Sequence, residues 1–244
     1  MTTLDTTFLL PVRIDNIERL ENIIGVTNYL TKILNPSIAV LECSSYNNGL
    51  LKKLLSKNIS YTFLLDDDPI FYRTKYINQM VRATTTPNIA IWDADVIAPK
   101  CQIASALKLL RQKEADFVFP YERYFLDTST ILRKLFLMAE EIEVLVHNAQ
   151  KMREMYMPNP VGGAFFVRKE AYVKAGLENE NFYGWGPEDH ERYHRLDNAG
   201  CKIMRIQGAL FHLSHGRGVN SRYQNADQYN LKFKEIAKVK RCSN

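Results

Sequence analysis

The chain has 244 residues, of which 46% are hydrophobic, and its formal net charge is +5 at pH 7. This length and composition are sufficient for a large buried core and exclude a disordered chain. The positive excess is small and spread along the sequence. Strong nucleic-acid binding requires a dense basic patch, so we expect no nucleic-acid partner.

Short apolar runs alternate with segments of helical spacing through the first half of the chain. The predicted strands cover residues 7–12, 38–42, 59–65, 88–92 and 116–119, and the predicted helices cover residues 15–34, 50–57, 72–84 and 99–114. Asp15 and Glu18 are placed like a capping box at the start of the first helix. The alternation predicts an α/β domain in which a mostly parallel central sheet is covered by helices on both faces.

In parallel sheets, binding sites lie beyond the carboxyl ends of the strands. Four charged residues end or follow predicted strands in this way: Arg13, Glu42, Asp93 and Asp95. Their placement alone makes them candidates for a site, without any motif.

The second half of the chain is less regular. Residues 130–156 are mostly of helical spacing, and packing against the sheet is the default for them, with pairing into a homo-oligomer or contact with an acceptor as alternatives. A strand at 161–167 begins with Gly162 and Gly163, where either a ligand approaches or the strand bulges. A further strand is predicted at 202–213. No repeat or low-complexity linker occurs, so residues 1–244 are expected to form one domain.

The four cysteines are far apart and form no C-x-x-C pair: Cys43, Cys101, Cys201 and Cys242. They indicate neither a disulfide framework nor a zinc knuckle. The N-terminus lacks a signal-like pattern, and no apolar run approaches the length of a membrane span. We expect a cytoplasmic protein.

Basic residues gather near the C-terminus: Lys232, Lys234, Lys238, Lys240 and Arg241. They either solvate a terminal helix or make peripheral contact with anionic lipid at the inner face of a membrane.

The stretch from Gly184 to Asp189 has the sequence Gly-Trp-Gly-Pro-Glu-Asp. Pro187 suits the first turn of a helix, which is predicted to continue to residue 198 with Gly200 near its end. The helix dipole stabilises the two carboxylates at its start. A Trp beside a carboxylate is suited to sugar binding, and the alternative is an acidic first helical turn with a half-buried Trp.

Two pairs of residues suggest a metal site. Asp93 and Asp95 follow an apolar strand, where carboxylates hold Mg²⁺ or Mn²⁺ against a diphosphate. His212 and His215 end another predicted strand, and imidazole ligands shift the preference toward Mn²⁺.

A competing motif lies in the predicted helix after Pro187. His190, Glu191 and His194 match H-E-x-x-H, which would make a zinc metalloprotease. The extended form of that motif fails, because Asp197 stands at its glycine position and Gly200 at its third histidine.

Roughly residues 7–220 resemble the GT-A fold glycosyltransferases, which have a Rossmann-like, three-layer α/β/α domain. The likeness is strongest to the β-1,4-galactosyltransferase group and the related bacterial chondroitin polymerase domains. It is carried, in order, by Pro11-Val12-Arg13 with Glu18 and Leu20, by Phe71-Tyr72-Arg73-Thr74-Lys75 with Asn78, by Asp93-Ala94-Asp95, by Val161-Gly162-Gly163 leading to Tyr183 and the Gly184–Asp189 stretch, and by His212 with His215.

The resemblance implies a role for each matching residue. The nucleotide, expected to be uridine, would be held by Pro11, Val12, Arg13, Phe71 and Arg73. Asp93 would serve the donor, and Asp95 and His215 would bind the metal. His212 stands where the animal enzymes have a methionine ligand. Trp185 and Glu188 would bind sugar, and Asp189 would be the catalytic base.

Three further residues are candidates because of their place in the predicted strands. Glu42 is counted with the donor-binding residues, and Gly162 and Gly163 with the acceptor-binding ones. Two departures from the family pattern affect the nucleotide contacts and the loop: Asp15 replaces a basic residue, and Pro187 replaces a glycine.

The predicted function is therefore a Mn²⁺- or Mg²⁺-dependent, inverting glycosyltransferase. It would move a hexose or N-acetylhexosamine from a UDP-sugar to a saccharide or lipid-linked glycan acceptor, in bacterial surface polysaccharide synthesis. Residues 7–120 would form the nucleotide-binding half and residues 158–220 the acceptor half.

Besides the metalloprotease, the sequence leaves two alternatives to a glycosyltransferase. A nucleotidyltransferase would need a glycine-rich loop after the first strand, and residues 11–15 contain no glycine. A non-catalytic carbohydrate-binding relative would keep Trp185 without needing Asp189.

Overall fold

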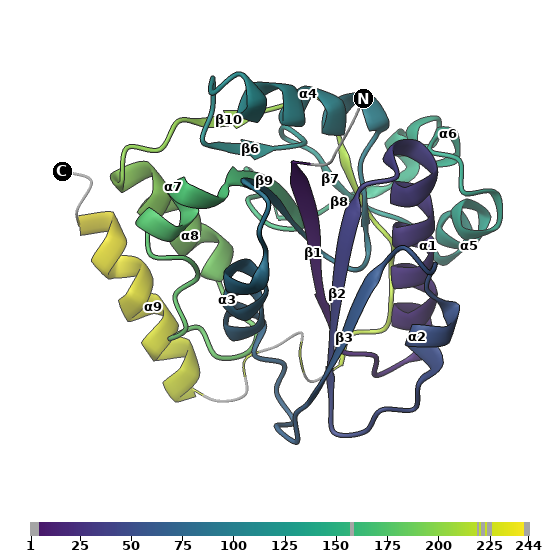
Figure 1. Cartoon of the computed structure of the whole chain (residues 1–244), viewed down its shortest axis with the longest axis horizontal. Coiled ribbons are helices and arrows are strands. Elements are labelled where there is room, and N and C mark those ends of the chain that lie inside the picture. Colours follow the sequence, from purple (N-terminus) through teal and green to yellow (C-terminus); the bar gives the residue numbers. More distant parts are fainter. Residues whose placement is uncertain (1–4, 157–158, 219, 221–222, 224–225, 242–244) are drawn as a thin grey trace.

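The computed structural model of the chain describes residues 5–156, 159–218, 220, 223 and 226–241. Figure 1 shows a central sheet between two groups of helices. On one side lie α1 (Ile17–Leu34) and α5 (Thr130–Ala139), and on the other α3 (Arg73–Ala83) and α8 (Glu188–Asn198). The chain has the predicted α/β architecture.

The main sheet has seven strands in the order β10-β6-β9-β4-β1-β2-β3. They are β1 (Thr6–Val12), β2 (Ser37–Ser44), β3 (Ser60–Leu65), β4 (Asn88–Trp92), β6 (Phe117–Phe119), β9 (Ala164–Arg168) and β10 (Ile203–Arg205). The strands from β4 to β3 are parallel, and so are β6 and β10, whereas β9 is antiparallel to both β4 and β6. The sheet is thus mostly parallel, as predicted, with one later strand inserted at its centre.

A second, smaller sheet has the order β5-β11-β7-β8. Its strands are β5 (Val96–Ile97), β7 (Phe125–Asp127), β8 (Arg153–Glu154) and β11 (Leu210–His212). The pairing sets His212 opposite Val96 of β5 and opposite Asp127 of β7. Because Val96 directly follows Asp95, this register carries His212 to the end of β4.

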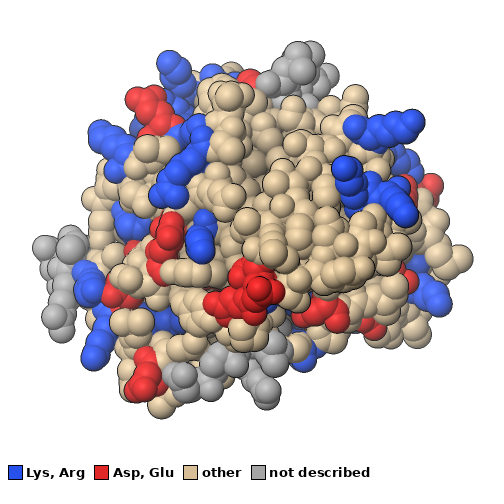
Figure 2. Space-filling model, turned by 60° about the horizontal axis from the view of Figure 1, so that its bottom comes forward, with Lys and Arg blue, Asp and Glu red and all other residues tan. Residues whose placement is uncertain are grey.

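The remaining helices are α2 (Leu50–Leu54), α4 (Lys100–Arg111), α6 (Glu143–Val146), α7 (Lys169–Lys174) and α9 (Ala226–Arg241), together with the 3-10 helix η1 (Ala149–Lys151). Within the described residues, no helix is both long and apolar enough to cross a membrane. On the face seen in Figure 2, Lys and Arg side chains are scattered rather than gathered in one dense patch. Cys43, Cys101 and Cys201 are free thiols, and Cys242 lies outside the described residues.

Three fully buried aromatic rings hold the centre of the main sheet. The ring of Phe8 lies 5.3 Å from that of Trp92 and 5.5 Å from that of Phe166, between centroids. The indole N–H of Trp92 donates to the Val96 carbonyl oxygen at 2.9 Å, and the Asp93 N–H donates to the Gly163 carbonyl oxygen at 2.8 Å. These bonds fix the turn that follows β4, so the core positions the acidic triplet.

Two predicted element starts are wrong by a few residues. The first helix is capped by Asn16, whose side-chain oxygen accepts from the Arg19 N–H at 2.8 Å, and not by Asp15. Strand β9 begins at Ala164, after the glycine pair, because Gly163 has φ +83° and turns the chain.

Two predicted long segments are also divided. Residues 130–156 are not one helix: Glu140 adopts a left-handed conformation with φ 52°, which ends α5 and leaves the short elements α6, η1 and β8. The predicted strand at 202–213 is two strands in different sheets, since Gly208, with φ +128°, redirects the chain between β10 and β11.

A buried ion pair ties α8 to the segment before it. The Arg192 Nε lies 2.7 Å from Glu178 Oε1, and both side chains are 1% exposed. The Tyr172 hydroxyl also donates to Glu178, and the Arg192 guanidinium lies 4.3 Å from the centroid of the Phe165 ring. Burial alone would raise the pKa of Glu178, but the charge of Arg192 and the bond from Tyr172 outweigh it, so the pKa is lowered.

We expect Glu178→Gln to lower the free energy of unfolding by about 3–5 kcal/mol at pH 7, because the buried guanidinium of Arg192 loses its fully buried counter-charge. Since the folded-state pKa of Glu178 is lowered, its stabilising contribution is present at neutral pH and is lost as the pH falls through that value. Urea denaturation at pH 7 and pH 3 measures both effects. Glu170→Gln, at a side chain 87% exposed, is the control and should change stability by less than about 0.5 kcal/mol. Equal losses in the two variants would contradict the assignment.

Candidate active site

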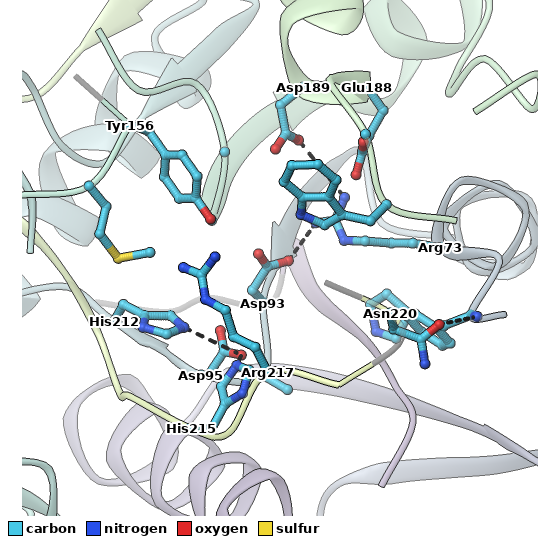
Figure 3. Close-up of a pocket in the computed structure, with 18 of the residues that line it drawn as sticks. Arg73, Asp93, Asp95, Tyr156, Glu188, Asp189, His212, His215, Arg217 and Asn220 are labelled. Carbon is cyan, nitrogen blue, oxygen red and sulfur yellow. Dashed lines mark hydrogen bonds and ion pairs between the residues drawn. The ribbon is translucent and has the colours of Figure 1, made fainter. Parts of the chain in front are cut away.

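A cavity of about 410 Å³ opens at the carboxyl ends of β1 and β4 (Figure 3). It gathers segments that are far apart in the chain. The predicted site residues that line it are Pro11, Val12, Arg13, Phe71, Arg73, Asp93, Asp95, Gly162, Gly163, Trp185, Glu188, Asp189, His212 and His215. Asp95 and Asp189 therefore face one shared space.

Glu42 is the predicted site residue that the structure does not bring to this cavity. Its side chain is 3% exposed and accepts a hydrogen bond of 2.6 Å from the Tyr61 hydroxyl, on the neighbouring strand β3. The carboxyl end of a strand is therefore not sufficient for a place in the site, and β2 is separated from β4 by β1.

Asp95, His212 and His215 form a cluster suited to a metal ion. The Asp95 Oδ2 lies 3.1 Å from His215 Nε2 and 3.9 Å from His212 Nε2, and one ligand atom from each residue lies within 4.8 Å of the other two. Among the described residues, this is the group of three or more acidic, His or Cys side chains close enough to hold an ion together. One carboxylate oxygen and two imidazole nitrogens suit Mn²⁺ better than Mg²⁺.

Asp127 orients one of these imidazoles. Its Oδ1 lies 2.8 Å from His212 Nδ1, so the His212 Nε2 is left to point toward Asp95. Carboxylates that hold the far nitrogen of a metal-binding histidine in this way fix its tautomer and ring orientation. Asp127 could not be predicted from the sequence, because only the register of β7 against β11 brings it to His212.

The charges in the cluster support one another. Burial works against the anion of Asp95, but the hydrogen bond from His215 and the charge of His212 outweigh it and hold the pKa of Asp95 well below its usual range. Burial likewise opposes the cation of His212, yet the bond to Asp127 and the charge of Asp95 raise its pKa. Each group thus favours the charged form of its partner.

Arg73 connects the two sides of the cavity. One of its terminal nitrogens donates to Asp93 Oδ1, and the other lies 3.9 Å from Asp189 Oδ1. Burial, with the nearby charges of Asp95 and Asp189, raises the pKa of Asp93 although Arg73 opposes the shift. The acidic turn after β4 is therefore linked through one guanidinium to the start of α8.

Asp189 is held on two sides. The Arg192 guanidinium, one helical turn later, donates to its Oδ1. A Cβ atom added to Gly162 would lie 2.4 Å from its Oδ2, so a side chain at that position would displace the carboxylate. The predicted glycine pair thus makes room for Asp189, and this gives a physical reason for Gly162.

Glu188 is 8% exposed, and its Oε2 has no hydrogen-bond partner among the described residues. Burial, followed by the charge of Asp189, raises the pKa of Glu188 to about 8. The shift favours the protonated carboxyl, which can donate a hydrogen bond. The two adjacent carboxyl groups differ in environment, which the sequence did not reveal.

Several lining residues were not predicted: Asp15, Arg19, Met155, Tyr156, Arg217, Asn220 and Tyr223. The Arg19 guanidinium lies 4.0 Å from Asp95 Oδ2, through Nη1, and 3.1 Å from Asp15 Oδ1, through Nε. A basic group thus reaches the cavity from Arg19, four residues after Asp15, the position at which the family pattern has a basic residue. The side-chain oxygen of Asn220 accepts from the Phe71 N–H at 2.8 Å. Folding thus brings Asn220 back to the segment between β3 and α3.

The H-E-x-x-H segment does not form a metal-binding group among the described residues. Glu191 is 2% exposed and paired with Arg195 at 2.9 Å, one turn along α8. His194 contacts the ring of Tyr193, while His190 lies at the rim of the cavity. Glu191 therefore serves helix packing, which removes the general base that a metalloprotease would need.

Residues 144–216 match a family model described as the N-terminal domain of galactosyltransferase. The fold is similar to that of the catalytic domain of Drosophila beta1,4-galactosyltransferase 7 in complex with xylobiose, with a TM-score of 0.58, 18% identity, and 95% of this chain and 80% of that chain covered. No curated protein sequence matches the chain.

Two further solved structures have the same fold. Glucosyl-3-phosphoglycerate synthase from Mycobacterium tuberculosis, in complex with Mn²⁺, UDP and phosphoglyceric acid, gives a TM-score of 0.55 at 14% identity, covering 98% of this chain and 79% of that one. A mannosyltransferase from Pyrobaculum calidifontis, in complex with GDP-Man and Mn²⁺, gives 0.57 at 14% identity, covering 88% and 58%.

These findings confirm the predicted fold: the chain has the GT-A fold of these glycosyltransferases. The resemblance to the galactosyltransferases, predicted from its motifs, is also confirmed by the family model and by the Drosophila structure.

We expect Asp127→Asn to weaken Mn²⁺ binding by about 10- to 100-fold, because His212 loses the carboxylate that orients it. Isothermal titration with MnCl₂ measures this directly. The control is Arg153→Ala, which removes the other partner of Asp127, an arginine 73% exposed, and leaves the contact with His212 in place. Equal Mn²⁺ affinity in Asp127→Asn and the native chain would contradict the role of Asp127.

The raised pKa of Glu188 predicts that the stability of the chain falls between mildly acidic and mildly basic pH. Between its usual pKa of 4.5 and its raised value of about 8, the unfolded chain has released the proton that the folded chain keeps. The free energy of unfolding therefore falls as the pH rises through this range, and levels off above it. Glu188→Gln has no carboxyl group to lose its proton, so its free energy of unfolding does not fall in this way. Its Tm relative to that of the native chain should therefore rise by several degrees from pH 5 to pH 8, at roughly 2–4 °C per kcal/mol. Glu114→Gln, on the surface, is the control, and a Tm difference for Glu188→Gln that is the same at both pH values would count against the raised pKa.

Proposed function

We propose that this chain transfers a hexose or N-acetylhexosamine from a UDP-sugar to a hydroxyl of a glycan acceptor, with Mn²⁺ as cofactor and inversion at the anomeric carbon. The observation that carries this proposal is the single cavity that contains both the Asp95–His212–His215 cluster and Asp189. The Drosophila galactosyltransferase, which has the same fold, occurs in complex with manganese, UDP-Gal and xylobiose.

The donor nucleotide would lie along the ends of β1 and β3. The Arg13 guanidinium is fixed there by Asp66, at 3.2 Å, and by the Asp68 carbonyl oxygen, at 2.7 Å, and it lies 5.7 Å from the centroid of the Phe71 ring. A ring held from one side by a cation offers its other face to a base. Pro11 and Val12 would line the floor, and Arg73 would approach the diphosphate from the Asp93 side.

The donor set of the cluster fits Mn²⁺, with Asp95, His212 and His215 as its ligands from the chain. Manganese bound there would stabilise the negative charge that develops on the departing UDP, an effect worth several kcal/mol in related chemistry. Asp127 would keep His212 in the orientation that this requires.

Asp189 would act as the general base. Its carboxylate, oriented by Arg192, would take the proton from the acceptor hydroxyl while that oxygen forms a bond to the anomeric carbon and the bond from that carbon to the UDP oxygen breaks. A single base opposite a single leaving group implies inversion. Arg73, 3.9 Å from Asp189, would keep the base and the donor side at a fixed separation.

Trp185 and Glu188 would bind the acceptor sugar, next to Gly162 and Gly163. Trp185 offers an aromatic ring at the cavity, and the protonated Glu188 would donate to a sugar oxygen. Adjacent carboxyl groups would then have different tasks, because Glu188 is buried and Asp189 is paired with arginine.

The setting we propose is bacterial surface polysaccharide synthesis at the cytoplasmic face of a membrane, with peripheral contact through the basic C-terminal segment. Supporting this contact, Lys234, Lys238 and Lys240 have exposed side chains on α9.

We expect Asp189→Asn to lower kcat for sugar transfer by about 10²- to 10⁴-fold, the usual contribution of a general base, with little change in Mn²⁺ or UDP affinity. Transfer to oligosaccharide acceptors is measured by UDP release, with the products separated by chromatography. The matched control is Asp197→Asn, an exposed aspartate on the same helix α8, which should keep full activity. Full activity in Asp189→Asn would instead indicate another base.

The donor is identified by thermal unfolding with Mn²⁺ and a panel of UDP-Gal, UDP-GalNAc, UDP-Glc and GDP-Man. UDP-sugars should stabilise the chain, because ligands that bind only the folded state raise its Tm. Stabilisation by GDP-Man alone would overturn the choice of nucleotide. Sugar binding without transfer to any acceptor would favour a non-catalytic relative of the fold.

A further inference from the structure

The turn that carries Trp185 is held by two side chains of the protein itself. A Cβ atom added to Gly184, which has φ +70°, would lie 2.6 Å from Ile70 Cγ2. A Cβ atom added to Gly186 would lie 2.6 Å from Lys232 Cδ and 3.2 Å from its Nζ. The two glycines that flank Trp185 thus make room for Ile70 on one side and Lys232 on the other, independently of any ligand.

Lys232 is an unusual residue for this position. It is 1% exposed, although it belongs to α9, a helix whose neighbouring lysines have exposed side chains. Its ammonium group donates to the Trp185 carbonyl oxygen and lies 5.5 Å from the centroid of the Tyr223 ring. Burial lowers the pKa of Lys232, and the charge of Glu188 opposes this shift.

A buried ammonium group is costly unless it is hydrogen-bonded. No carboxylate lies within ion-pair distance of Lys232 among the described residues, so its hydrogen bond to Trp185 supplies much of the compensation. Movement of the Trp185 turn would leave the ammonium unsatisfied. The position of the turn and the burial of Lys232 are therefore coupled.

A row of aromatic rings joins the same turn to α9. The Trp185 ring lies 4.9 Å from that of Tyr223, Tyr223 lies 5.0 Å from Tyr229, and Tyr229 lies 4.3 Å from Phe233, between centroids. In Figure 1, α9 runs along the outside of α8. The side chain of Asn179 also donates to Glu235 on α9, at 3.0 Å. The helix is thus anchored at several points while Lys232 reaches the turn.

We propose that Lys232 is a positioning residue for sugar binding: it holds the Trp185 turn against α9 and so sets the place of the Trp185 ring in the cavity. This inference rests on the proposed function in one respect, namely that Trp185 contacts the acceptor sugar. Lys232 itself does not line the cavity.

The test is Lys232→Met, which keeps the apolar stem and removes the ammonium group. The acceptor KM should rise by about tenfold, as expected for the loss of a charged hydrogen bond, while kcat changes by less than about threefold. Lys234→Met is the matched control, two residues along the same helix with an exposed side chain, and should leave KM unchanged. A fall in Tm with no change in acceptor KM would overturn the proposal, because it would show a structural role alone.

Acrylamide quenching of tryptophan fluorescence tests the same inference without substrate. The chain has two tryptophans, and Trp92 is 0% exposed, so quenching reports mainly on Trp185. Lys232→Met should increase the quenching constant, whereas Lys234→Met should not. If the native chain transfers no sugar, the proposed function fails, and if Lys232→Met leaves quenching unchanged, the positioning role fails.

Gly186→Ala gives an independent perturbation should Lys232→Met not fold. The added methyl group would meet the Lys232 stem at 2.6 Å and push it from the turn. It should also raise both the quenching constant and the acceptor KM, and native values for both would overturn the proposal.

Discussion

The pairing of β11 between β5 and β7 is the constraint on which the site depends. One register sets His212 beside the residue that follows Asp95 and, on its other edge, beside Asp127. A shift of one residue would turn the His212 side chain to the opposite face of the small sheet, because side chains alternate along a strand. The cluster of Asp95, His212 and His215 would then lose one imidazole together with the carboxylate that orients it.

Arg73 links the acidic turn after β4 to the other half of the cavity. It begins α3, yet its guanidinium lies between Asp93 at the end of β4 and Asp189 at the start of α8. Arg192, in turn, connects Asp189 to the buried Glu178. Charges that are costly to bury are thus arranged as an alternating chain of acids and arginines, in which each group offsets the burial of the next. The position of Asp189 follows from this chain as much as from its helix.

The parts of this structure that could be predicted are those that local pattern determines. Apolar runs of strand length alternate with helical spacing, which gives the parallel strands and the residues at their carboxyl ends, such as Arg13 and Asp95. Motifs added Trp185, Asp189 and the two histidines. The order of the strands was not visible in the sequence. Glu42 was predicted because it ends a strand, but that strand, β2, lies between β1 and β3, where Glu42 contacts Tyr61.

The features of the site that could not be predicted from the sequence depend on contacts between distant segments. Asp127 reaches His212 through sheet register, and Asn220 reaches Phe71 across most of the chain length. The differing environments of Glu188 and Asp189 arise from burial and from Arg73 and Arg192, none of which is visible in two adjacent acids. The mostly helical segment predicted over 130–156 is broken at Glu140, which takes a left-handed conformation that spacing does not signal.

The central place of β9 constrains how the molecule assembles. Because β9 separates β4 from β6, strand β6 cannot join the main sheet until the chain has been synthesised past residue 168. A nascent polypeptide that ends before this point exposes the open edge of β4, and exposed edges of this kind invite pairing with other chains. The main sheet is therefore completed only when β9 and β10 have been synthesised, and Asp189 lies between these two strands in the chain.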